Sequence, residues 1–257
     1  PLNKEQLNQA KDFLEGLRHG KEMYAKLNEP TPIEKMIDGE GEFAVLFTNL
    51  NFDTAVLGRN PLFASMSDWI ENVIDYWIEH ETSLKLIIRV HPGEIKLVTP
   101  SSDFIGPKIR KRIKGHSNII LFDAIDKVDS YTLIENMKFG LIYSSTIGLE
   151  ISYMNKVCMI AGDAFYKNEA FVIAPKTLSE YFGQLKGLIK DPSIENKKSK
   201  LEILHFIFFI YFHRVKRLNG ISMDHSNHVN LFSFETIEEL DQMNKETFEE
   251  FEKEISI

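Results

Sequence analysis

Short apolar runs separated by amphipathic stretches form the pattern of this chain between residues 43 and 161. Each run is short and rich in Val, Ile, Leu and Phe, which is typical of a strand buried on both faces. The expected strands are 43–48, 84–90, 118–122, 139–143 and 157–161. Strands that alternate with helices in this order predict an α/β fold, a Rossmann-like parallel sheet with helices on both faces.

Apolar residues spaced three and four positions apart predict the helices between and around these strands. Ser67 is expected to cap a helix over 67–80, whose core-facing side carries Trp69, Val73, Tyr76 and Trp77. The other helices are expected over 3–28 with a break near Gly20, and over 107–114, 130–137, 147–154, 178–190, 194–218 and 235–255. Residues 224–230 are expected to form an irregular loop.

Changes in composition along the chain predict three regions. Residues 1–41 read as an N-terminal helix and connector, 42–192 as a Rossmann-like domain, and 193–257 as C-terminal helices. Because the sequence starts with Pro1 and not with methionine or a signal peptide, it reads as a fragment that lacks an N-terminal part. The C-terminal helices are then expected to pack on the Rossmann-like domain or on a missing domain.

Composition and charge exclude several classes of protein. The 257 residues are 43% hydrophobic and 26% charged, an ordinary globular balance, and the net charge of −8 argues against a nucleic-acid partner. A single cysteine, Cys158, permits no disulfide framework and predicts a reducing, cytoplasmic location. No zinc spacing, Walker-type loop, dinucleotide-binding glycine motif or hydrolase nucleophile elbow occurs, so no metal or cofactor is expected.

The chain is expected to be organised around residues 138–151. The run at 139–143 reads as a strand that ends at Ser144-Ser145-Thr146 and turns directly into a helix near Ile147. Hydroxyl groups and free backbone N–H groups then point at one place, which favours an anion such as a phosphate. Capping alone is the commoner use of such residues. Gly148 permits close approach of a ligand or relieves packing, and Glu150 binds sugar hydroxyls or acts as a first-turn acid.

A second candidate segment follows the strand at 84–90. Pro92 holds His91 extended, and Arg89 alternates with His91 along the strand, so both are expected to point the same way. His91 can donate to a phosphate or protonate a leaving oxygen, or it can satisfy a loop carbonyl. Glu94 either orients His91 or is solvated.

Two further loops lie after strands. Asp53, after the first strand, is a candidate base or sugar-hydroxyl ligand, although aspartate is also an ordinary turn residue. The loop 162–167, which contains Tyr166, can close over a ligand or be a plain surface loop.

The stretch 201–212 is intensely apolar and is followed by Arg214, Lys216 and Arg217. At about a dozen residues it is shorter than the ~20 needed to span a bilayer, which favours a buried helix. Peripheral attachment to an anionic membrane face through the basic end is the alternative.

Three segments together resemble the bacterial capsule polysaccharide biosynthesis proteins, glycosyltransferases of the GT-B architecture. They are Phe47-Thr48-Asn49 with Phe52-Asp53-Thr54-Ala55, Ile88-Arg89-Val90-His91-Pro92-Gly93-Glu94, and Tyr143-Ser144-Ser145-Thr146-Ile147-Gly148-Leu149-Glu150. The His-Pro pair and the serine pair are also similar to motifs of bacterial sialyl- and Kdo-transferases that hold the phosphate of a CMP-sugar. The resemblance covers roughly residues 3–220.

The resemblance implies a donor-binding domain over 42–192 that takes a nucleotide-sugar as substrate. It implies that His91 and the residues Ser144, Ser145 and Thr146 lie at the phosphate and that Glu150 lies near the ribose or base. Fixed donors of this kind stabilise a leaving phosphate without a metal. Arg89, Glu94, Gly148 and Tyr166 are the further expected nucleotide-binding residues, and Asp53 and His91 the expected catalytic ones.

The family's acidic-acidic-glycine motif is not recognisable, since Asp38-Gly39-Glu40 is a poor match. The base and the glycan acceptor site are therefore expected in a missing N-terminal domain. The expected activity is transfer of a sugar from a nucleotide-sugar donor, for which a CMP-sugar is the candidate, to a capsular or surface polysaccharide. The alternatives are a non-catalytic nucleotide-sugar-binding or scaffold module of a capsule assembly complex, and an epimerase or phosphoesterase on a similar sheet.

Overall fold

The computed structural model describes residues 1–19, 41–50, 56, 58–80, 82–96, 104–191, 200–214, 218–223 and 229–255. The chain forms two compact units, one of Tyr24–Ile203 and one of Pro1–Met23 with Leu204–Ile257. The expected boundaries at 41/42 and 192/193 stay predictions, because residues 20–40 and 192–199 lie outside the described part.

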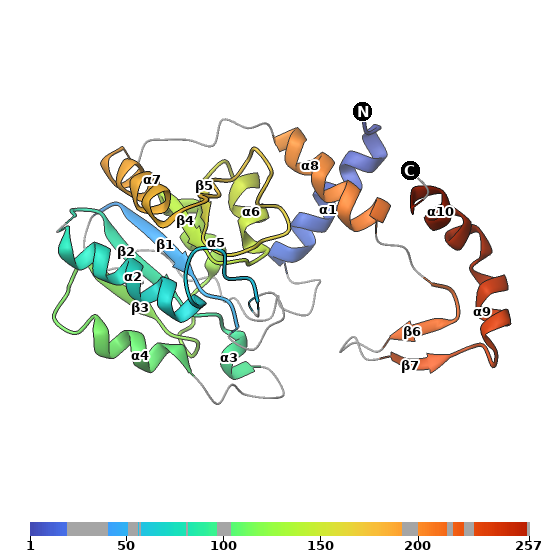
Figure 1. Cartoon of the computed structure of the whole chain (residues 1–257), viewed down its shortest axis with the longest axis horizontal. Coiled ribbons are helices and arrows are strands. Elements are labelled where there is room, and N and C mark those ends of the chain that lie inside the picture. The colour runs from blue at the N-terminus through green and yellow to red at the C-terminus, as the bar shows by residue number, and fades with distance from the viewer. Residues whose placement is uncertain are drawn as a thin grey trace. The chain divides into compact units, whose positions relative to one another are not determined.

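The larger unit is built on a five-stranded parallel sheet, which confirms the predicted α/β Rossmann-like fold (Figure 1). Its strands are β1 (Phe43–Phe47), β2 (Lys85–Arg89), β3 (Ile119–Phe122), β4 (Phe139–Ile142) and β5 (Val157–Ile160). In space they follow the order β3-β2-β1-β4-β5, with β1 paired to β2 from Phe43↔Lys85 and to β4 from Val45↔Gly140. The centre of the sheet is thus the first strand in the sequence.

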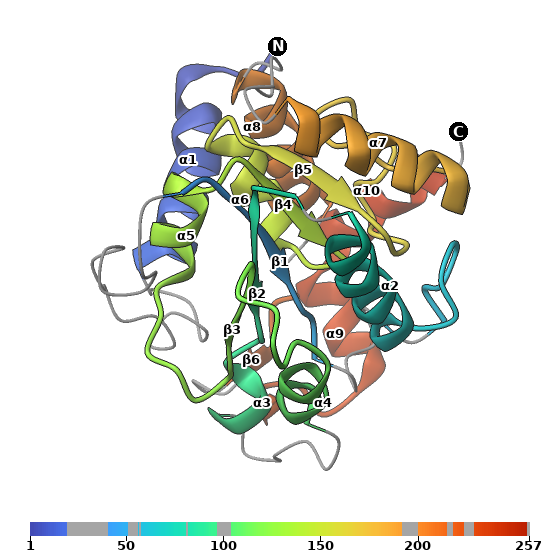
Figure 2. The same cartoon turned by 90° about the vertical axis from the view of Figure 1, so that its left-hand side faces the viewer.

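Helices cover both faces of this sheet (Figures 1 and 2). On one face, α2 (Met66–Glu79), α4 (Ile105–Arg112) and α7 (Leu178–Lys190) pack on alternate strand residues such as Leu46 and Leu141. On the other face, α5 (Ser130–Asn136) and α6 (Ile147–Tyr153) close over Gly140, where a Cβ would lie 2.9 Å from Ile151 Cδ1. A short helix α3 (Gly93–Lys96), which the pattern did not predict, follows β2.

Helix α2 shows how the core is fixed. Trp69 and Trp77 are completely buried, and each indole donates a hydrogen bond, to Tyr181 Oη at 2.7 Å and to the Leu84 carbonyl at 2.8 Å. Buried indole N–H groups need such partners. The predicted cap was wrong by two residues: Ser65, not Ser67, accepts the Asp68 N–H at 3.0 Å, because the helix begins at Met66.

The smaller unit contains α1 (Lys4–His19), the later part of α8 (Lys200–Phe208), a π-helical segment (Phe209–Arg214), β6 (Ile221–Met223), β7 (Val229–Phe232), α9 (Ile237–Met243) and α10 (Lys245–Ile255). Phe13 of α1 packs on Tyr211 with ring centroids 4.3 Å apart. The change from α- to π-helix at Phe209 was not predicted. Within the described ranges, none of the helices combines the length and the apolar content that a membrane span requires.

Two predictions for the smaller unit need correction. The helix predicted over 235–255 is two helices, because the backbone leaves the helical conformation at Asn244 (φ −121°, ψ 17°). The Asn244 side-chain amide pairs there with both the N–H and the carbonyl of Asn219, at 2.6 and 3.0 Å. Residues 229 and 230, predicted as loop, belong to strand β7, which pairs antiparallel with β6. The rest of that predicted loop, residues 224–228, lies outside the described residues.

Candidate functional site

The topology of the sheet points to one place for a ligand. The helices that follow β1 and β2 cover one face, and those that follow β3 and β4 cover the other, so the winding reverses between β1 and β4. Open parallel sheets bind ligands outside the carboxyl ends of the strands at such a switch point. Here Thr48 and Asn49 follow β1 directly, and Ser144 follows β4 after one residue, the buried Tyr143.

Two hydrogen bonds that the Thr48 and Asn49 side chains accept join the three central strand ends. Thr48 Oγ1 accepts from the His91 N–H at 2.9 Å, and Asn49 Oδ1 accepts from the Ser144 N–H at 3.4 Å. The two predicted segments, at His91 and at Ser144, therefore lie on one rim. They are not adjacent, because β1 stands between β2 and β4 and places their backbones about 10 Å apart. A ligand that touches both must lie across the end of β1.

His91 is half-buried, and its ring is oriented by its own turn. The Gly93 N–H donates to His91 Nδ1 at 3.0 Å. Since Nδ1 is an acceptor, the neutral ring carries its proton on Nε2. A Cβ at residue 93 would lie 2.8 Å from Nδ1, so glycine is required for this approach. The bond from Gly93 thus fixes the orientation of the ring and leaves Nε2 as the nitrogen that carries the proton.

The hydroxyl residues after β4 differ in exposure. Ser144 is 5% exposed, Ser145 is half-buried and Thr146 is exposed. Ser145 Oγ accepts from the Ile147 N–H at 3.4 Å, a long bond, and the Thr146 side chain does not cap α6. The predicted helix start at Ile147 is confirmed. The hydroxyls that reach the surface here are those of residues 145 and 146.

Glu150 lies in the first turn of α6 and accepts a hydrogen bond from the Tyr131 hydroxyl of α5. Burial raises the pKa of Glu150 to about 7, and the bond from Tyr131 lowers it in part. Near neutral pH the carboxyl is therefore protonated to a larger extent than an ordinary glutamate. A partly neutral acid repels a nearby phosphate less than a carboxylate does.

Gly148 and Tyr166 pack against each other. Tyr166 is completely buried, and its hydroxyl donates to the Ser145 carbonyl. A Cβ on residue 148 would collide with that hydroxyl and would lie 2.6 Å from Ile142 Cδ1. The glycine therefore admits Tyr166, which holds the Ser145 turn in place. Of the two expected roles of Gly148, relief of packing explains why a glycine stands here.

Arg89 and Glu94 are buried inside the fold, with exposed fractions of 2% and 1%. Arg89 donates to the carbonyls of Asp123, at 2.8 Å, and Val128, at 3.2 Å, and so orders the loop after β3. Burial lowers the pKa of Arg89 to about 10, while Asp126, Asp123 and Asp129 oppose this change. Glu94 Oε2 accepts from the Ile105 N–H at 3.4 Å and is not a solvated residue. These contacts argue against direct binding of a nucleotide by either side chain.

The remaining candidates add little to the rim. Asp53 lies outside the described residues, as does Asp38-Gly39-Glu40. Asp123, just after β3, pairs with Arg110 at 2.9 Å. No three His, Cys, Asp or Glu side chains within the described ranges are grouped to hold a metal ion.

The sequence did not predict that Thr48 accepts a hydrogen bond from His91, nor that Glu150 pairs with Tyr131. The available signal for Thr48 was a polar pair, Thr48-Asn49, directly after a wholly apolar strand. Nothing in the sequence pairs Tyr131 with Glu150, because their contact depends on how α5 packs against α6.

No protein-family model matches this sequence, and no curated protein matches it either. Solved structures do match its fold. The β-Kdo 2,4-transferase of KpsC from Thermosulfurimonas dismutans matches with a TM-score of 0.51 at 17% identity, over 79% of this chain and 55% of that one. At this identity the match shows the fold alone, a Rossmann-like fold of the GT-B type.

Two further structures match with TM-scores of 0.43. The β-Kdo 2,7-transferase of the same KpsC is 15% identical over 79% of this chain and 52% of that one. UDP-GlcNAc 2-epimerase from Neisseria meningitidis, bound to UDP-GlcNAc, is 15% identical over 78% of this chain and 50% of that one. The chain spans about half the length of the structures it matches.

Proposed function

We propose that this chain is the nucleotide-sugar-binding half of a GT-B type glycosyltransferase that acts on a capsular or surface polysaccharide. The observation that carries the proposal is the joined rim at the switch point, where Thr48 and Asn49 bond to His91 and Ser144. The GT-B fold shared with a Kdo transferase supports it.

The chemistry of the rim suits a nucleotide's phosphate. His91 contributes an N–H donor on Nε2, and Ser145 and Thr146 contribute hydroxyls beside the first turn of α6. As the glycosidic bond to a nucleoside phosphate breaks, negative charge grows on the phosphate oxygens, and fixed donors stabilise that charge. In this proposal Glu150, whose pKa burial raises to about 7, binds ribose hydroxyls and repels the phosphate less than an ordinary carboxylate would.

The donor nucleotide proposed is CMP, and the acceptor site and catalytic base are assigned to a domain outside this chain. Asp53 remains the proposed acid of this half. In this arrangement the chain alone binds nucleotide and shows no transfer. The alternative, a non-catalytic scaffold module, makes a different prediction for a protein that also contains the second domain. That protein would show no sugar transfer either.

Calorimetric titration with CMP, UDP and GDP tests the proposal. His91→Ala and Ser145→Ala should each weaken binding by about 1–3 kcal/mol if the lost group donates to a charged phosphate. His116→Ala, at another half-buried histidine, and Ser179→Ala, at an exposed serine of α7, are the matched controls. If His91→Ala and Ser145→Ala both bind nucleotide as tightly as the unmodified chain, the proposal is wrong.

A further inference from the structure

The loop after β5, residues 162–167, holds the Ser145 turn at two points. The Gly162 N–H donates to the Tyr143 carbonyl at 2.8 Å, and the buried Tyr166 hydroxyl donates to the Ser145 carbonyl. Both carbonyls belong to the short segment that leads from β4 into α6. The geometry of the proposed phosphate site therefore depends on the position of this loop.

The same loop is bound in turn by Arg59, which lies between β1 and α2. The Arg59 guanidinium donates to the Asp163 carbonyl at 3.1 Å, and the Asp163 N–H donates to the Arg59 carbonyl at 3.2 Å. The Asp163 carboxylate lies 3.9 Å from the guanidinium and also pairs with Lys167 at 2.5 Å. Each of the two residues is both donor and acceptor, so the pair fixes the two backbones against each other. Arg59 and Asp163 thus form a bracket between two loops that are 104 residues apart in the sequence.

The bracket passes the carboxyl end of β4. In the sheet β4 lies between β1 and β5, so a segment that follows β1 reaches the loop after β5 only by passing β4. Asn60, next to Arg59, accepts a hydrogen bond at 2.5 Å from the hydroxyl of Tyr143, the first residue after β4. The segment around Arg59 therefore lies at the strand end from which the Ser145 turn starts.

The exposure of the bracket separates its role from that of the core. The side chains of Arg59 and Asp163 are 44% and 42% exposed, and ion pairs at such positions contribute little to the free energy of unfolding, because water screens them. The place of the contact is more informative than its strength. Asp163 lies in the sequence between Gly162 and Tyr166, the two residues through which the loop holds the turn.

We propose that Arg59 is a positioning residue of the nucleotide site. Through Asp163 it holds the loop 162–167, and through that loop it holds the Ser145 turn in the geometry that receives a phosphate. The inference rests on the proposed function, because it takes the Ser145 turn as the phosphate site. An ordinary surface ion pair would have no effect on that turn.

Hydrogen exchange of the whole chain, followed by mass spectrometry, tests the bracket without any ligand. In Arg59→Ala, peptides from 141–150 and 162–169 should exchange about fivefold faster or more, because the loop and the turn open together once the bracket is lost. Arg59→Lys keeps a cation and a donor at this position, so it should retain most of the protection. The urea midpoint of Arg59→Ala should stay within about 0.4 M of that of the unmodified chain, which shows that the fold is intact.

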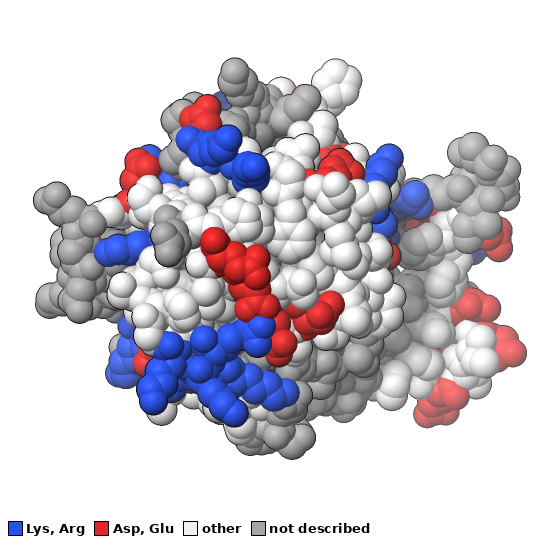
Figure 3. Space-filling model, turned by 60° about the vertical axis from the view of Figure 1, so that its left-hand side comes forward, with Lys and Arg blue, Asp and Glu red and all other residues white. Residues whose placement is uncertain are grey.

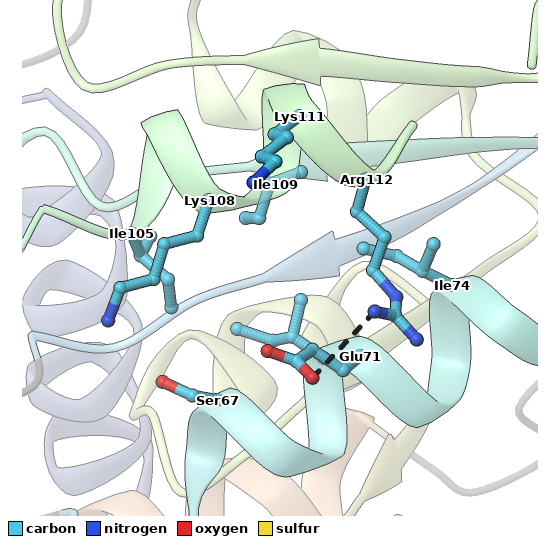
Figure 4. A pocket seen from close by; sticks show the side chains of 9 residues that line it. Ser67, Glu71, Ile74, Ile105, Lys108, Ile109, Lys111 and Arg112 are labelled. Atoms are coloured by element: carbon cyan, nitrogen blue, oxygen red, sulfur yellow. Dashed lines mark ion pairs between the residues drawn. The ribbon is translucent and has the colours of Figure 1, made fainter. Parts of the chain in front are cut away.

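Arg112 provides the matched control. Its side chain is 40% exposed and pairs with Asp75, and Glu71 lies 3.9 Å from it on the wall of a pocket between α2 and α4 (Figure 4). It is the last residue of α4, which runs back from the carboxyl edge to the start of β3. Basic side chains gather densely on one face of the molecule (Figure 3), and Arg112→Ala removes one positive charge, as Arg59→Ala does. A loss of general attraction for anions is therefore the same in both variants.

Titration with CMP measures the consequence for binding. Arg59→Ala should weaken CMP binding about fivefold or more, whereas Arg59→Lys and Arg112→Ala should stay within about twofold of the unmodified chain. Equal exchange rates or equal CMP affinities in Arg59→Ala and Arg112→Ala would overturn the inference, and so would a lysine variant as impaired as the alanine variant.

His91→Ala keeps the two proposals apart, because it should lower nucleotide affinity without changing the exchange of peptides from 162–169. If the unmodified chain bound none of CMP, UDP and GDP, the proposed function would fail, and the exchange measurement alone would decide whether Arg59 holds the turn.

Discussion

Replacing Gly148 by alanine tests the packing that holds the Ser145 turn. The added Cβ would lie 2.6 Å from Ile142 Cδ1, well inside the 3.4–4 Å of ordinary contact, and would collide with the Tyr166 hydroxyl. Neither neighbour is free to yield, since both are completely buried and the hydroxyl is bonded to the Ser145 carbonyl. Overpacking of this kind costs about 1–3 kcal/mol. Alanine's better helix propensity returns up to about 1 kcal/mol, so a net loss of about 1–2 kcal/mol is expected.

Urea unfolding followed by the fluorescence of the buried Trp69 and Trp77 measures this loss. Gly187→Ala in α7 is the matched control, because no atom lies within 4 Å of its added Cβ, and it should stabilise by about 0.5–1 kcal/mol. Tyr166→Phe should cost about 1 kcal/mol for the lost hydrogen bond, and the double variant should be more stable than the sum of the two single effects predicts. If Gly148→Ala matched Gly187→Ala, or the cycle were additive, the packing argument would be refuted.

Two further predictions concern α6 and α2. Burial raises the pKa of Glu150 from 4.5 to about 7, so the native state binds this proton more tightly than the unfolded state does. The free energy of unfolding should therefore fall by about 3 kcal/mol relative to that of Glu150→Gln as pH rises from about 4.5 to about 7, with no further change at higher pH. Parallel pH profiles of the two proteins in urea unfolding would contradict this. Ser65→Ala should destabilise the protein by about 1 kcal/mol, because α2 loses its cap. Ser67→Ala should change the stability by no more than about 0.5 kcal/mol. Thermal unfolding that ranks the two variants the other way would indicate that Ser67 is the cap.

The positions of most elements could be predicted from the sequence, because they depend on local pattern. The apolar runs at 43–48 and 139–143 became β1 and β4 within one residue at each end, and 178–190 became α7 without any change. Errors appeared where a distant contact decides the backbone. Asn244 ends α9 through its bonds to Asn219, twenty-five residues away, and no local pattern reports such a pair.

The candidate site was predictable only as a set of strand ends. That His91 and Ser144 follow parallel strands is visible in the sequence, and this was sufficient to expect them on one edge of a sheet. The order of the strands is not visible, and it is the order that inserts Thr48 and Asn49 between them.

By itself, the sequence determined the fold class and the residues that stand at the carboxyl edge, since hydrophobic period and turn chemistry act within a few residues. Tertiary structure alone decided which of those residues reach the surface. Arg89, Glu94 and Tyr166 look like ligand-binding residues in the sequence, yet each is buried and bonded within the fold. The pocket between α2 and α4 likewise exists only once two helices more than 25 residues apart pack side by side, because burial and concavity are properties of non-local contacts.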